Sequence, residues 1–498
     1  MAAHDQDTLH ANPAHGLRQA KWLLIGALLM GLNSQAQVSV PDRVAQWQVM
    51  NYFPAAHSWE RMWTQFDKAT IDADFKRIAD LHANTVRIIL QVPAIGWPTP
   101  NPRMLDELAQ VVALADSHGL AVQLTLFDHW GSYDHGTESQ QWAKTVLAPY
   151  RDDRRIAFVE LQNEIAPSND AAMAWARDML PYLRSLVGRT LVTLSPAAGV
   201  VNLALLQQRL GTSQPDFYDF HFYGQPALAY QALAEARRIA GSVPLLIGET
   251  GFSTSLSNLQ VGPMPNVAAL EAYQAYFYRH LNFATTRLGL PAAAPWTLSD
   301  FVPGTLATTN ETEYSYGLFR VDGSPKPVVA EELAFLNDGT VNLSFNGNFE
   351  QGIDTATGRL PAIWRRHHAS QATFALDGST AYSGTSSARI SQSTGDATGI
   401  PAFFTSPITA IFPGRPCVAS VQARGLAATG AQRICLAFFA SDGSYLSNVC
   451  SPSLAAGATP WTRLEVSAQA PGRAAAVEIH LSSQNNTGTV WFDSVTFR

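Results

Sequence analysis

The stretch that decides the fold of this chain is IAFVELQNE, residues 156–164. Its first seven residues are mostly apolar, and a short apolar run predicts a strand buried on both faces, as in a parallel sheet. The run ends in Asn163 and Glu164, and in a barrel of parallel strands the carboxyl ends of the strands carry the chemistry. The stretch therefore predicts a parallel sheet and a candidate functional position.

The same pattern repeats on both sides of this stretch. Further strands are predicted at 47–53, 84–91, 121–127, 190–195, 217–222, 244–248 and 293–298. Helical patterns lie between or after them at 71–82, 104–118, 171–187, 227–239, 267–288 and 327–336. Eight strands alternating with helices predict a (β/α)₈ barrel. A doubly wound open sheet, the alternative, would predict a G-x-G-x-x-G turn, which this sequence lacks.

The pattern changes after residue 336. Residues 337–339 read Asn-Asp-Gly, a linker, and short alternating runs follow at 373–376, 387–391, 417–423, 434–440, 461–467, 475–481 and 490–497. Such runs, separated by Gly-, Ser- and Asn-rich turns, predict a β-sandwich. We expect an α/β TIM barrel at 37–338 and an all-β sandwich domain at 339–498.

The first 36 residues predict a signal peptide. Arg18 and Lys21 precede an apolar run at 22–32, which is too short to cross a membrane but fits a signal-peptide core. Ser34 and Ala36 supply the small residues of a cleavage site after Ala36. We expect a secreted or periplasmic protein, with an uncleaved membrane anchor as the alternative.

Composition and charge limit the kinds of partner that this protein can have. The net charge is −7 and no basic run exists, so nucleic acid is not expected as a partner. A neutral sugar polymer needs no charge steering, and the 12 Trp and 14 Tyr residues offer flat apolar faces for sugar rings. After signal cleavage we expect a monomer without a membrane partner.

The three cysteines all lie beyond residue 410. Cys435 and Cys450 flank Asp442-Gly443, the strongest two-residue hairpin signal. With that turn the two cysteines fall opposite each other on neighbouring strands, within disulfide reach. An oxidising compartment would close this bond, and Cys417 is left over.

Two carboxylates stand at the ends of predicted strands four and seven, Glu164 and Glu249. These strands face each other across a barrel, so the two side chains can flank a bound sugar. Glycoside hydrolysis needs one carboxyl group to protonate the leaving oxygen and a second to attack the anomeric carbon or activate water. The sequence has no H-E-x-x-H and no Cys/His ligand spacing, and we expect neither a metal ion nor a cofactor in catalysis. It also has no G-x-S-x-G, which argues against an esterase.

Asn163-Glu164 and Glu249 resemble the signature of the clan A retaining glycoside hydrolases with a (β/α)₈ barrel. The detail is most similar to glycoside hydrolase family 5, and the resemblance covers about 46–336. That family has a pattern of eight positions, all matched in this sequence: Arg87, His129, Asn163, Glu164, His221, Tyr223, Glu249 and Trp296. Ile165 departs from the pattern, because the family usually has Pro after Asn-Glu.

The resemblance implies a role for each catalytic residue. Glu164 would be the general acid and then the general base, with a raised pKa that keeps it protonated in the resting enzyme. Glu249 would be the nucleophile, kept ionised by the positive charge of Arg87 and a hydrogen bond from Tyr223. Arg87 could instead pair mainly with Glu160, an interior carboxylate of strand four.

The resemblance also implies substrate contacts. Asn163 would hold the sugar 2-hydroxyl, His221 and His129 would bond the acid or the sugar, and Trp296 would lie under the sugar. Further aromatic candidates for flanking subsites are Trp59, Trp97, Trp130 and Tyr316. Glu311 and Glu313 follow strand eight, where they could line the cleft, but we interpret them as solvated loop charges.

The start and end of the C-terminal region, at 346–350 and 490–495, resemble carbohydrate-binding sandwich modules. The resemblance implies glycan binding, with a stabilising appendage to the barrel as the alternative. Glu350 and Asp493 could share a structural calcium, or both could be surface carboxylates. The candidates for sugar contact are Trp364, Tyr382, Tyr445 and Trp461.

These features together predict a secreted retaining glycoside hydrolase that cleaves β-glycosidic bonds by double displacement. We expect endo action on a β-glucan or β-mannan polysaccharide or its oligosaccharides, as in a cellulase or mannanase. The alternatives are an exo-β-glycosidase that releases monosaccharides and a non-catalytic carbohydrate-binding protein. A cleft open at both ends would favour endo action, and a blocked pocket would favour exo action.

Overall fold

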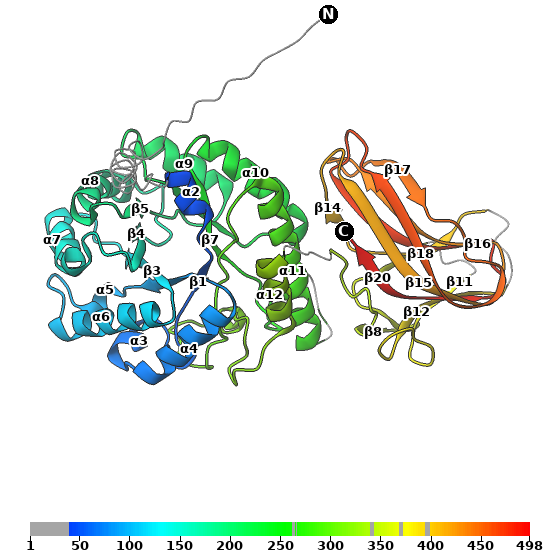
Figure 1. Ribbon diagram of the computed structural model, residues 1–498. Coiled ribbons are helices and arrows are strands. Elements are labelled where there is room, and N and C mark those ends of the chain that lie inside the picture. Colours follow the sequence, from blue (N-terminus) through cyan, green and yellow to red (C-terminus); the bar gives the residue numbers. More distant parts are fainter. Residues whose placement is uncertain (1–38, 261–263, 265, 339–342, 368–371, 394–398) are drawn as a thin grey trace, which may run out of the picture.

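The computed structural model describes residues 39–260, 264, 266–338, 343–367, 372–393 and 399–498. The predicted signal peptide lies outside the described residues. The chain forms a barrel of strands ringed by helices and, beside it, a β-sandwich (Figure 1). The predicted fold class is confirmed.

Seven of the eight predicted barrel strands are present. Five of them form one parallel sheet in chain order: β1 (Val49–Asn51), β2 (Thr85–Ile89), β3 (Ala121–Phe127), β4 (Ile156–Gln162) and β5 (Leu191–Thr193). Two more pair in parallel, β6 (Tyr218–Phe222) and β7 (Leu245–Thr250). All seven residues of β4 are buried, including Glu160 and Gln162.

The predicted eighth strand, 293–298, takes its place in the barrel without being a regular strand. The N–H of Ala294 donates to the carbonyl of Ile247, and the N–H of Leu298 donates to the carbonyl of Asn51. The segment thus joins β7 to β1 and closes the ring. Pro295 has no N–H to donate, so the ladder is interrupted there and a single bridge to Thr250 remains.

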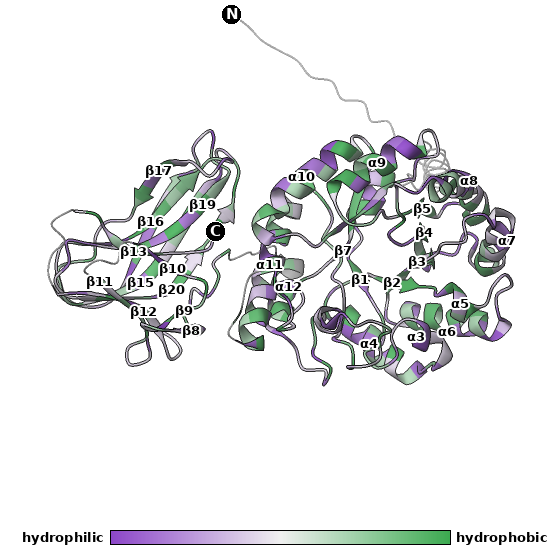
Figure 2. Ribbon diagram, turned by 180° about the vertical axis from the view of Figure 1, so that it is seen from behind, coloured by the Kyte–Doolittle hydropathy of each residue, from purple (hydrophilic) through white to green (hydrophobic). Residues whose placement is uncertain are grey.

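Helices surround the barrel strands and cover their outer face (Figure 1). The helices are α2 (Val40–Ala45), α3 (Glu60–Thr64), α4 (Lys68–Asp80), α5 (Val92–Ile95), α6 (Pro102–Ser117), α7 (Gly136–Leu147), α8 (Asp170–Val187), α9 (Val200–Leu210), α10 (Ala229–Ala240), α11 (Val267–Leu288) and α12 (Pro327–Asp338). The short 3₁₀ helices are η1 (Ala148–Tyr150), η2 (Pro226–Leu228) and η3 (Glu311–Ser315). Most helices mix hydrophilic and hydrophobic residues, as amphipathic helices do (Figure 2).

Local capping explains where several helices begin. The side chains of Asp67, Asn101, Asn169 and Asn266 accept hydrogen bonds from the first free N–H groups of α4, α6, α8 and α11. No such side-chain cap starts α7 or α9, and the sequence pattern did not single these two helices out. α12 ends at Asp338, where the boundary between the two domains was predicted.

The C-terminal domain consists of two antiparallel sheets and a hairpin. One sheet has the order β10 (Arg365–His367), β13 (Ala402–Thr405), β19 (Ala476–Gln484), β16 (Ala431–Phe439) and β17 (Tyr445–Cys450), with β14 (Thr409–Ala410) beside β19. The other has the order β11 (Ala372–Asp377), β12 (Ser387–Gln392), β20 (Thr489–Phe497), β15 (Pro416–Ala428) and β18 (Gly457–Gln469). The hairpin joins β8 (Gly352–Thr355) to β9 (Gly358–Pro361). All seven predicted sandwich strands are present.

The predicted disulfide is confirmed. Cys435 on β16 and Cys450 on β17 are directly opposite each other in the ladder, and their sulfur atoms are bonded. A bulge follows at Phe438 and Phe439, close to the turn. Cys417 is buried in the sandwich core, and burial raises the pKa of its thiol.

The two domains meet along α11. The guanidinium of Arg415, from the sandwich, lies 4.1 Å from the ring centre of Phe283 on α11. The guanidinium of Arg287 on α11 lies 4.3 Å from the ring centre of Phe412 in the sandwich. Each domain therefore places an arginine on an aromatic ring of the other.

No helix among the described residues combines the length and apolar character that crossing a membrane requires.

Candidate active site

A cleft of about 1020 Å³ opens at the carboxyl ends of the barrel strands. Glu164 and Glu249 both line it, at the ends of β4 and β7. A carboxylate oxygen of Glu164 and one of Glu249 lie within 4.8 Å of each other. The two glutamates that the sequence singled out are therefore brought together across the barrel.

Glu249 is nearly buried and held on two sides. Its Oε1 atom contacts Nη1 of Arg87, and its Oε2 atom accepts a hydrogen bond of 2.9 Å from the hydroxyl of Tyr223. Arg87 places its positive charge directly against this carboxylate. The Tyr223 hydroxyl fixes its orientation.

Arg87 connects Glu249 to the barrel interior. Its Nε and Nη2 atoms donate to Oε2 of Glu160 at 3.0 and 2.7 Å, and Nη2 also donates to Oδ1 of Asn163 at 2.8 Å. Burial alone would lower the pKa of Arg87, but Glu160 and Glu249 outweigh it and raise the pKa. Arg87 therefore contacts both Glu249 and Glu160, the two partners that the sequence offered as alternatives.

Glu164 lies in a more open environment. Its side chain is 40% exposed, and its backbone has a φ of +47°, which a non-glycine residue rarely adopts. The N–H of Glu164 donates to Oγ of Ser195 at 2.9 Å, and this contact helps to hold the turn after β4. The strained turn directs the carboxylate into the cleft.

His221 stands between the two glutamates. Its Nδ1 atom lies 3.0 Å from Oε1 of Glu164 and 3.4 Å from Oε2 of Glu249. Burial alone would lower the pKa of His221, but Glu249, Glu164 and Asp219 outweigh it and raise the pKa to about 9. The imidazole is therefore a cation at neutral pH.

The pKa of Glu164 differs from the raised value that the sequence led us to expect. Burial favours a raised pKa for Glu164, but the hydrogen bond and charge of His221 outweigh burial and lower this pKa. The expected raised pKa is therefore not found while His221 is protonated. Glu164 and His221 form a pair whose proton lies on the imidazole side and whose atoms are within hydrogen-bond distance.

Aromatic residues form much of the cleft wall. Trp296 lines the cleft and packs edge-on against Trp59, with ring centres 5.7 Å apart. Trp130 and Tyr316 also line the cleft, whereas Trp97 packs on Trp130 behind it. The flat faces available to a sugar ring thus lie next to the two glutamates.

The position after β3 differs from the expectation for His129. The His129 side chain is 79% exposed and lies at the rim of the cleft. Asp128 points inward instead, where its carboxylate accepts hydrogen bonds from Asn163 at 2.9 Å and Gln91 at 2.6 Å. The residue that orients Asn163 is therefore Asp128, one position before the predicted histidine.

Sequence reasoning missed two buried residues beneath the cleft and underrated a third residue, which lines it. Asn51, at the end of β1, accepts a hydrogen bond of 3.0 Å from Arg87. Asp219 is buried beside His221 on β6. Glu313 is half-buried and lines the cleft, and burial with the charges of Glu249 and Glu164 raises its pKa, so it is no solvated loop charge.

Two groups of side chains among the described residues could offer three ligands to a metal ion, Glu160 with Asp219 and His221, and Glu164 with His221 and Glu249. Arg87 already contacts both Glu160 and Glu249. Its charge neutralises the carboxylates that a cation would need. That catalysis uses no metal ion or cofactor stays a prediction.

The predicted calcium ligands hold a loop of the sandwich. Glu350 accepts hydrogen bonds of 2.9 and 3.0 Å from the backbone N–H groups of residues 385 and 386. Asp493 accepts bonds of 2.7 and 3.1 Å from those of residues 382 and 383. Donor groups thus occupy sites that a calcium ion would share, and a structural calcium there stays a prediction that this geometry does not favour.

This chain is similar to several solved structures. Solved structures with a similar fold include a GH5_18 protein from Streptomyces cattleya in complex with GlcNAc (20% identity, 60% of this chain and 82% of that chain, TM-score 0.49). They also include a GH5_18 protein from Bifidobacterium longum subsp. infantis (18% identity, 59% of this chain and 79% of that chain, TM-score 0.47). A third is the exo-β-1,4-mannosidase Op5Man5 from Opitutaceae bacterium strain TAV5 (19% identity, 59% of this chain and 59% of that chain, TM-score 0.48). No curated protein matches the chain significantly.

The family model described as cellulase, glycosyl hydrolase family 5, matches residues 40–287. These residues span the barrel from α2 to the last turn of α11 and include both glutamates of the cleft. The barrel of this chain therefore belongs to glycoside hydrolase family 5.

Proposed function

We propose that this chain is a retaining β-glycoside hydrolase with Glu164 as the acid and base and Glu249 as the nucleophile. The observation that carries the proposal is the short separation of the two carboxylates, with oxygens within 4.8 Å. Retaining enzymes have carboxyl groups about 5–5.5 Å apart, whereas inverting enzymes need about 6.5–9.5 Å to admit a water molecule. The narrow spacing supports attack by the carboxylate itself.

The reaction then proceeds in two displacements. Glu249 attacks the anomeric carbon while Glu164 gives a proton to the leaving oxygen, and a glycosyl ester forms on Glu249. In the second step Glu164 takes a proton from water, and the water oxygen displaces Glu249. Substrate binding expels water from the half-exposed Glu164, which disfavours its anion, so Glu164 takes up a proton from solvent while His221 keeps its own.

The neighbouring residues have supporting roles. Arg87 and Tyr223 hold the ionised Glu249 in position for attack. Asn163 is fixed by Arg87 and Asp128, which leaves it oriented to bind a hydroxyl group next to the anomeric centre. Trp296 provides the floor under the sugar ring.

For the substrate we propose a β-linked glucan or mannan chain, cleaved internally. A cleft of about 1020 Å³ is at the upper end of the usual size of ligand sites, about 300–1000 Å³, and so has room for more than one sugar ring. Trp59 and Trp130 add aromatic surface to the same cleft.

Exo action on a terminal sugar is the second candidate, and Glu313 favours it. Its carboxylate is oriented by Nδ2 of Asn310 at 3.1 Å and lines the same cleft as Glu164 and Glu249. A half-buried carboxylate beside the scissile bond can accept hydrogen bonds from two hydroxyls of a terminal sugar. A non-catalytic carbohydrate-binding protein is the least favoured reading, since both carboxylates and their supporting residues are in place.

We also propose that the protein is secreted and that its sandwich domain binds glycan. The disulfide is consistent with folding in an oxidising compartment. Of the four aromatic candidates on the sandwich, Trp364 is buried and donates its Nε1–H to the carbonyl of Phe345. Tyr382 and Trp461 lie together, with ring centres 5.9 Å apart, and Tyr382 is exposed. This pair is therefore the better candidate for sugar contact.

The test is a hydrolysis panel of β-glucans, β-mannans, xylan and aryl β-glycosides, with NMR detection of the first anomer formed. We expect the β-anomer first, and no hydrolysis by Glu249→Ala. For Glu164→Ala, added azide should restore cleavage of an activated aryl glycoside and yield the β-glycosyl azide. An α-anomer as first product would exclude the retaining mechanism, and monosaccharide as sole product would replace endo by exo action.

A further inference from the structure

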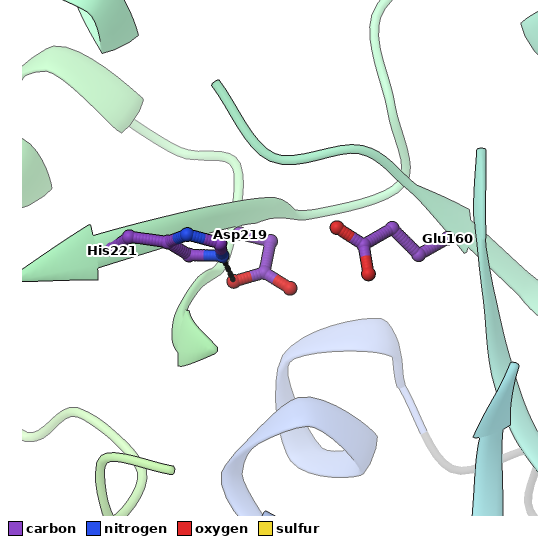
Figure 3. Close-up of side chains that lie close together, drawn as sticks. All are labelled: Glu160, Asp219 and His221. Carbon is purple, nitrogen blue, oxygen red and sulfur yellow. Dashed lines mark ion pairs between the residues drawn. The ribbon is translucent and has the colours of Figure 1, made fainter. Parts of the chain in front are cut away.

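Three buried polar side chains lie close together in the barrel (Figure 3). Glu160 comes from β4, and Asp219 and His221 come from β6, where positions two apart point to the same side of the strand. All three are buried, and one ligand-type atom of each lies within 4.8 Å of the others. His221 is the only one of the three that also contacts Glu164 and Glu249 in the cleft.

Glu160 is fully satisfied by its neighbours. Besides Arg87, its oxygens accept hydrogen bonds from the hydroxyls of Thr125 and Ser195 at 2.6 and 2.7 Å, and from the amide of Gln123 at 3.1 Å. Its charge is therefore compensated within its own group of contacts, and it has no further need of the imidazole.

Asp219 is in the opposite situation. Neither of its oxygens accepts a hydrogen bond from any residue that the structure describes. Nε2 of His221 likewise has no hydrogen-bond partner among these residues. The two unmatched groups face each other, with Nε2 and Oδ1 3.9 Å apart (Figure 3). Leaving a buried donor and a buried acceptor unpaired is costly, so a small rotation that joins them is favoured.

The neighbouring strand is shaped around this carboxyl group. A Cβ atom placed on Gly248 of β7 would lie 1.9 Å from Oδ1 of Asp219, so only glycine leaves room for the Asp219 side chain. The glycine and the aspartate are thus matched to each other across β6 and β7. This steric match is independent of the hydrogen-bond argument.

We propose that Asp219 is a positioning residue that accepts the Nε2–H of His221 and so keeps its Nδ1–H directed at Glu164 and Glu249. The inference rests on the proposed roles of these two glutamates. Asp219 touches neither the substrate nor the reacting atoms and acts only through the imidazole.

The arrangement matters most in the second displacement. When Glu249 becomes a glycosyl ester, it loses the negative charge that faces His221. Asp219 is then the buried anion that still holds the imidazole as a cation. The cation in turn keeps Glu164 ionised, which is the state a general base requires.

The other charged groups around this pair are compatible with that role. Burial and the charges of Glu160 and Glu249 raise the pKa of Asp219 to about 7, while His221 and Arg87 act in the opposite direction. Once Glu249 is esterified, one of the anions that disfavour an ionised Asp219 is removed. Asp219 is thus most readily ionised in the step in which its charge is needed.

The first experiment needs no substrate. In wild-type protein labelled with ¹⁵N-histidine, we expect both His221 nitrogens to be protonated at pH 7, with a slowly exchanging Nε2 proton. In Asp219→Asn, which keeps shape and removes the charge, the pKa of His221 should fall by about 1–3 units, the usual effect of losing an adjacent opposite charge. His221→Asn identifies the resonances.

Asp74→Asn is the matched control. Asp74 is also a buried carboxyl group of the barrel, bonded to the hydroxyl of Tyr52 at 3.0 Å, and it does not contact His221. Its substitution should leave the His221 resonances unchanged. An unprotonated Nε2 in the wild type at pH 7 would overturn the proposal, and so would an unchanged His221 pKa in Asp219→Asn. The wild-type measurement tests the proposal even if the variant does not fold.

A kinetic measurement tests the link to the reaction. With a dinitrophenyl β-glycoside, the breakdown of the glycosyl ester limits kcat, whereas its formation limits kcat/KM. We expect Asp219→Asn to lower kcat at least tenfold more than kcat/KM. An equal loss in kcat and kcat/KM would mean that Asp219 has a structural role only. If the wild type hydrolyses nothing but its His221 pKa still depends on Asp219, the proposed function is rejected and the positioning role stands.

Discussion

The imidazole of His221 lies 3.0 Å from Glu164, close enough for the two side chains to share one proton. Glu249 contacts the same nitrogen at 3.4 Å and Arg87 on its other side. One glutamate is therefore coupled to a group that titrates and the other to a group that never loses its charge. This difference fits the proposed roles of Glu164 as acid and base and of Glu249 as nucleophile.

The stability of the protein should fall in mild alkali because of His221. Its folded pKa is raised from 6.5 to about 9, so its stabilising contribution is complete below pH 6.5 and lost as pH rises through about 9. We expect a loss of up to about 3 kcal/mol in unfolding free energy over this range. Urea denaturation at several pH values measures it. His221→Asn should flatten the profile, whereas the surface substitution His135→Asn should not.

Arg87 should be essential for both stability and activity. Arg87→Ala leaves Glu160 and Glu249 buried without a counter-charge, which costs about 3–5 kcal/mol in unfolding free energy. Arg87→Lys keeps the charge but loses the planar fork that spans both carboxylates, so kcat/KM should still fall at least a hundredfold. Arg238→Ala, at an exposed ion pair, should change neither. A Lys variant with full activity would contradict this account.

Tyr223→Phe should impair catalysis more than folding. The lost hydroxyl is the hydrogen-bond donor that orients Glu249, so we expect kcat/KM to fall about tenfold or more. The control is Tyr278→Phe, which removes another buried hydroxyl, bonded to the backbone carbonyl of Thr250 at 3.0 Å. That change should cost about 1 kcal/mol of stability and leave kcat/KM nearly unchanged. Equal kinetic effects in the two variants would argue against a role for Tyr223.

Reduction of the disulfide should destabilise the sandwich. Cys435 and Cys450 are 15 positions apart, and closing a loop of that size stabilises a fold by about 3 kcal/mol. Calorimetry should show a lower melting temperature for the wild type in reductant. The double variant Cys435→Ala with Cys450→Ala should melt at that lower temperature with or without reductant. A wild type insensitive to reductant would mean that the bond adds no stability.

The contact along α11 should couple the unfolding of the two domains. Arg415 lies over Phe283, and Arg287 lies over Phe412, at distances typical of strong cation–π contacts. We expect Phe283→Ala to separate one calorimetric transition into two. Arg424→Ala, which removes a cation 6.0 Å from the ring of Trp491 within the sandwich, should not. A single unchanged transition in Phe283→Ala would show that the domains are coupled elsewhere.

The sequence by itself determined the features that depend on local pattern. The apolar runs gave the positions of seven barrel strands and all seven predicted sandwich strands, because strand periodicity and turn residues act over short distances. The Asp442-Gly443 signal predicted the hairpin that brings Cys435 opposite Cys450, and a bulge between the turn and the cysteines contributes to their register. The ends of β4 and β7 placed Glu164 and Glu249 at the same face of the barrel.

Only the tertiary structure decided which side chains converge inside the barrel. Asp128 rather than His129 points inward, because the turn after β3 puts His129 at a φ of +49° and exposes its side chain. The match of Asp219 with Gly248 likewise depends on the register of β6 against β7. Contacts between distant strands are set by register, twist and backbone turns, and a single sequence encodes these only through the packing of the whole barrel.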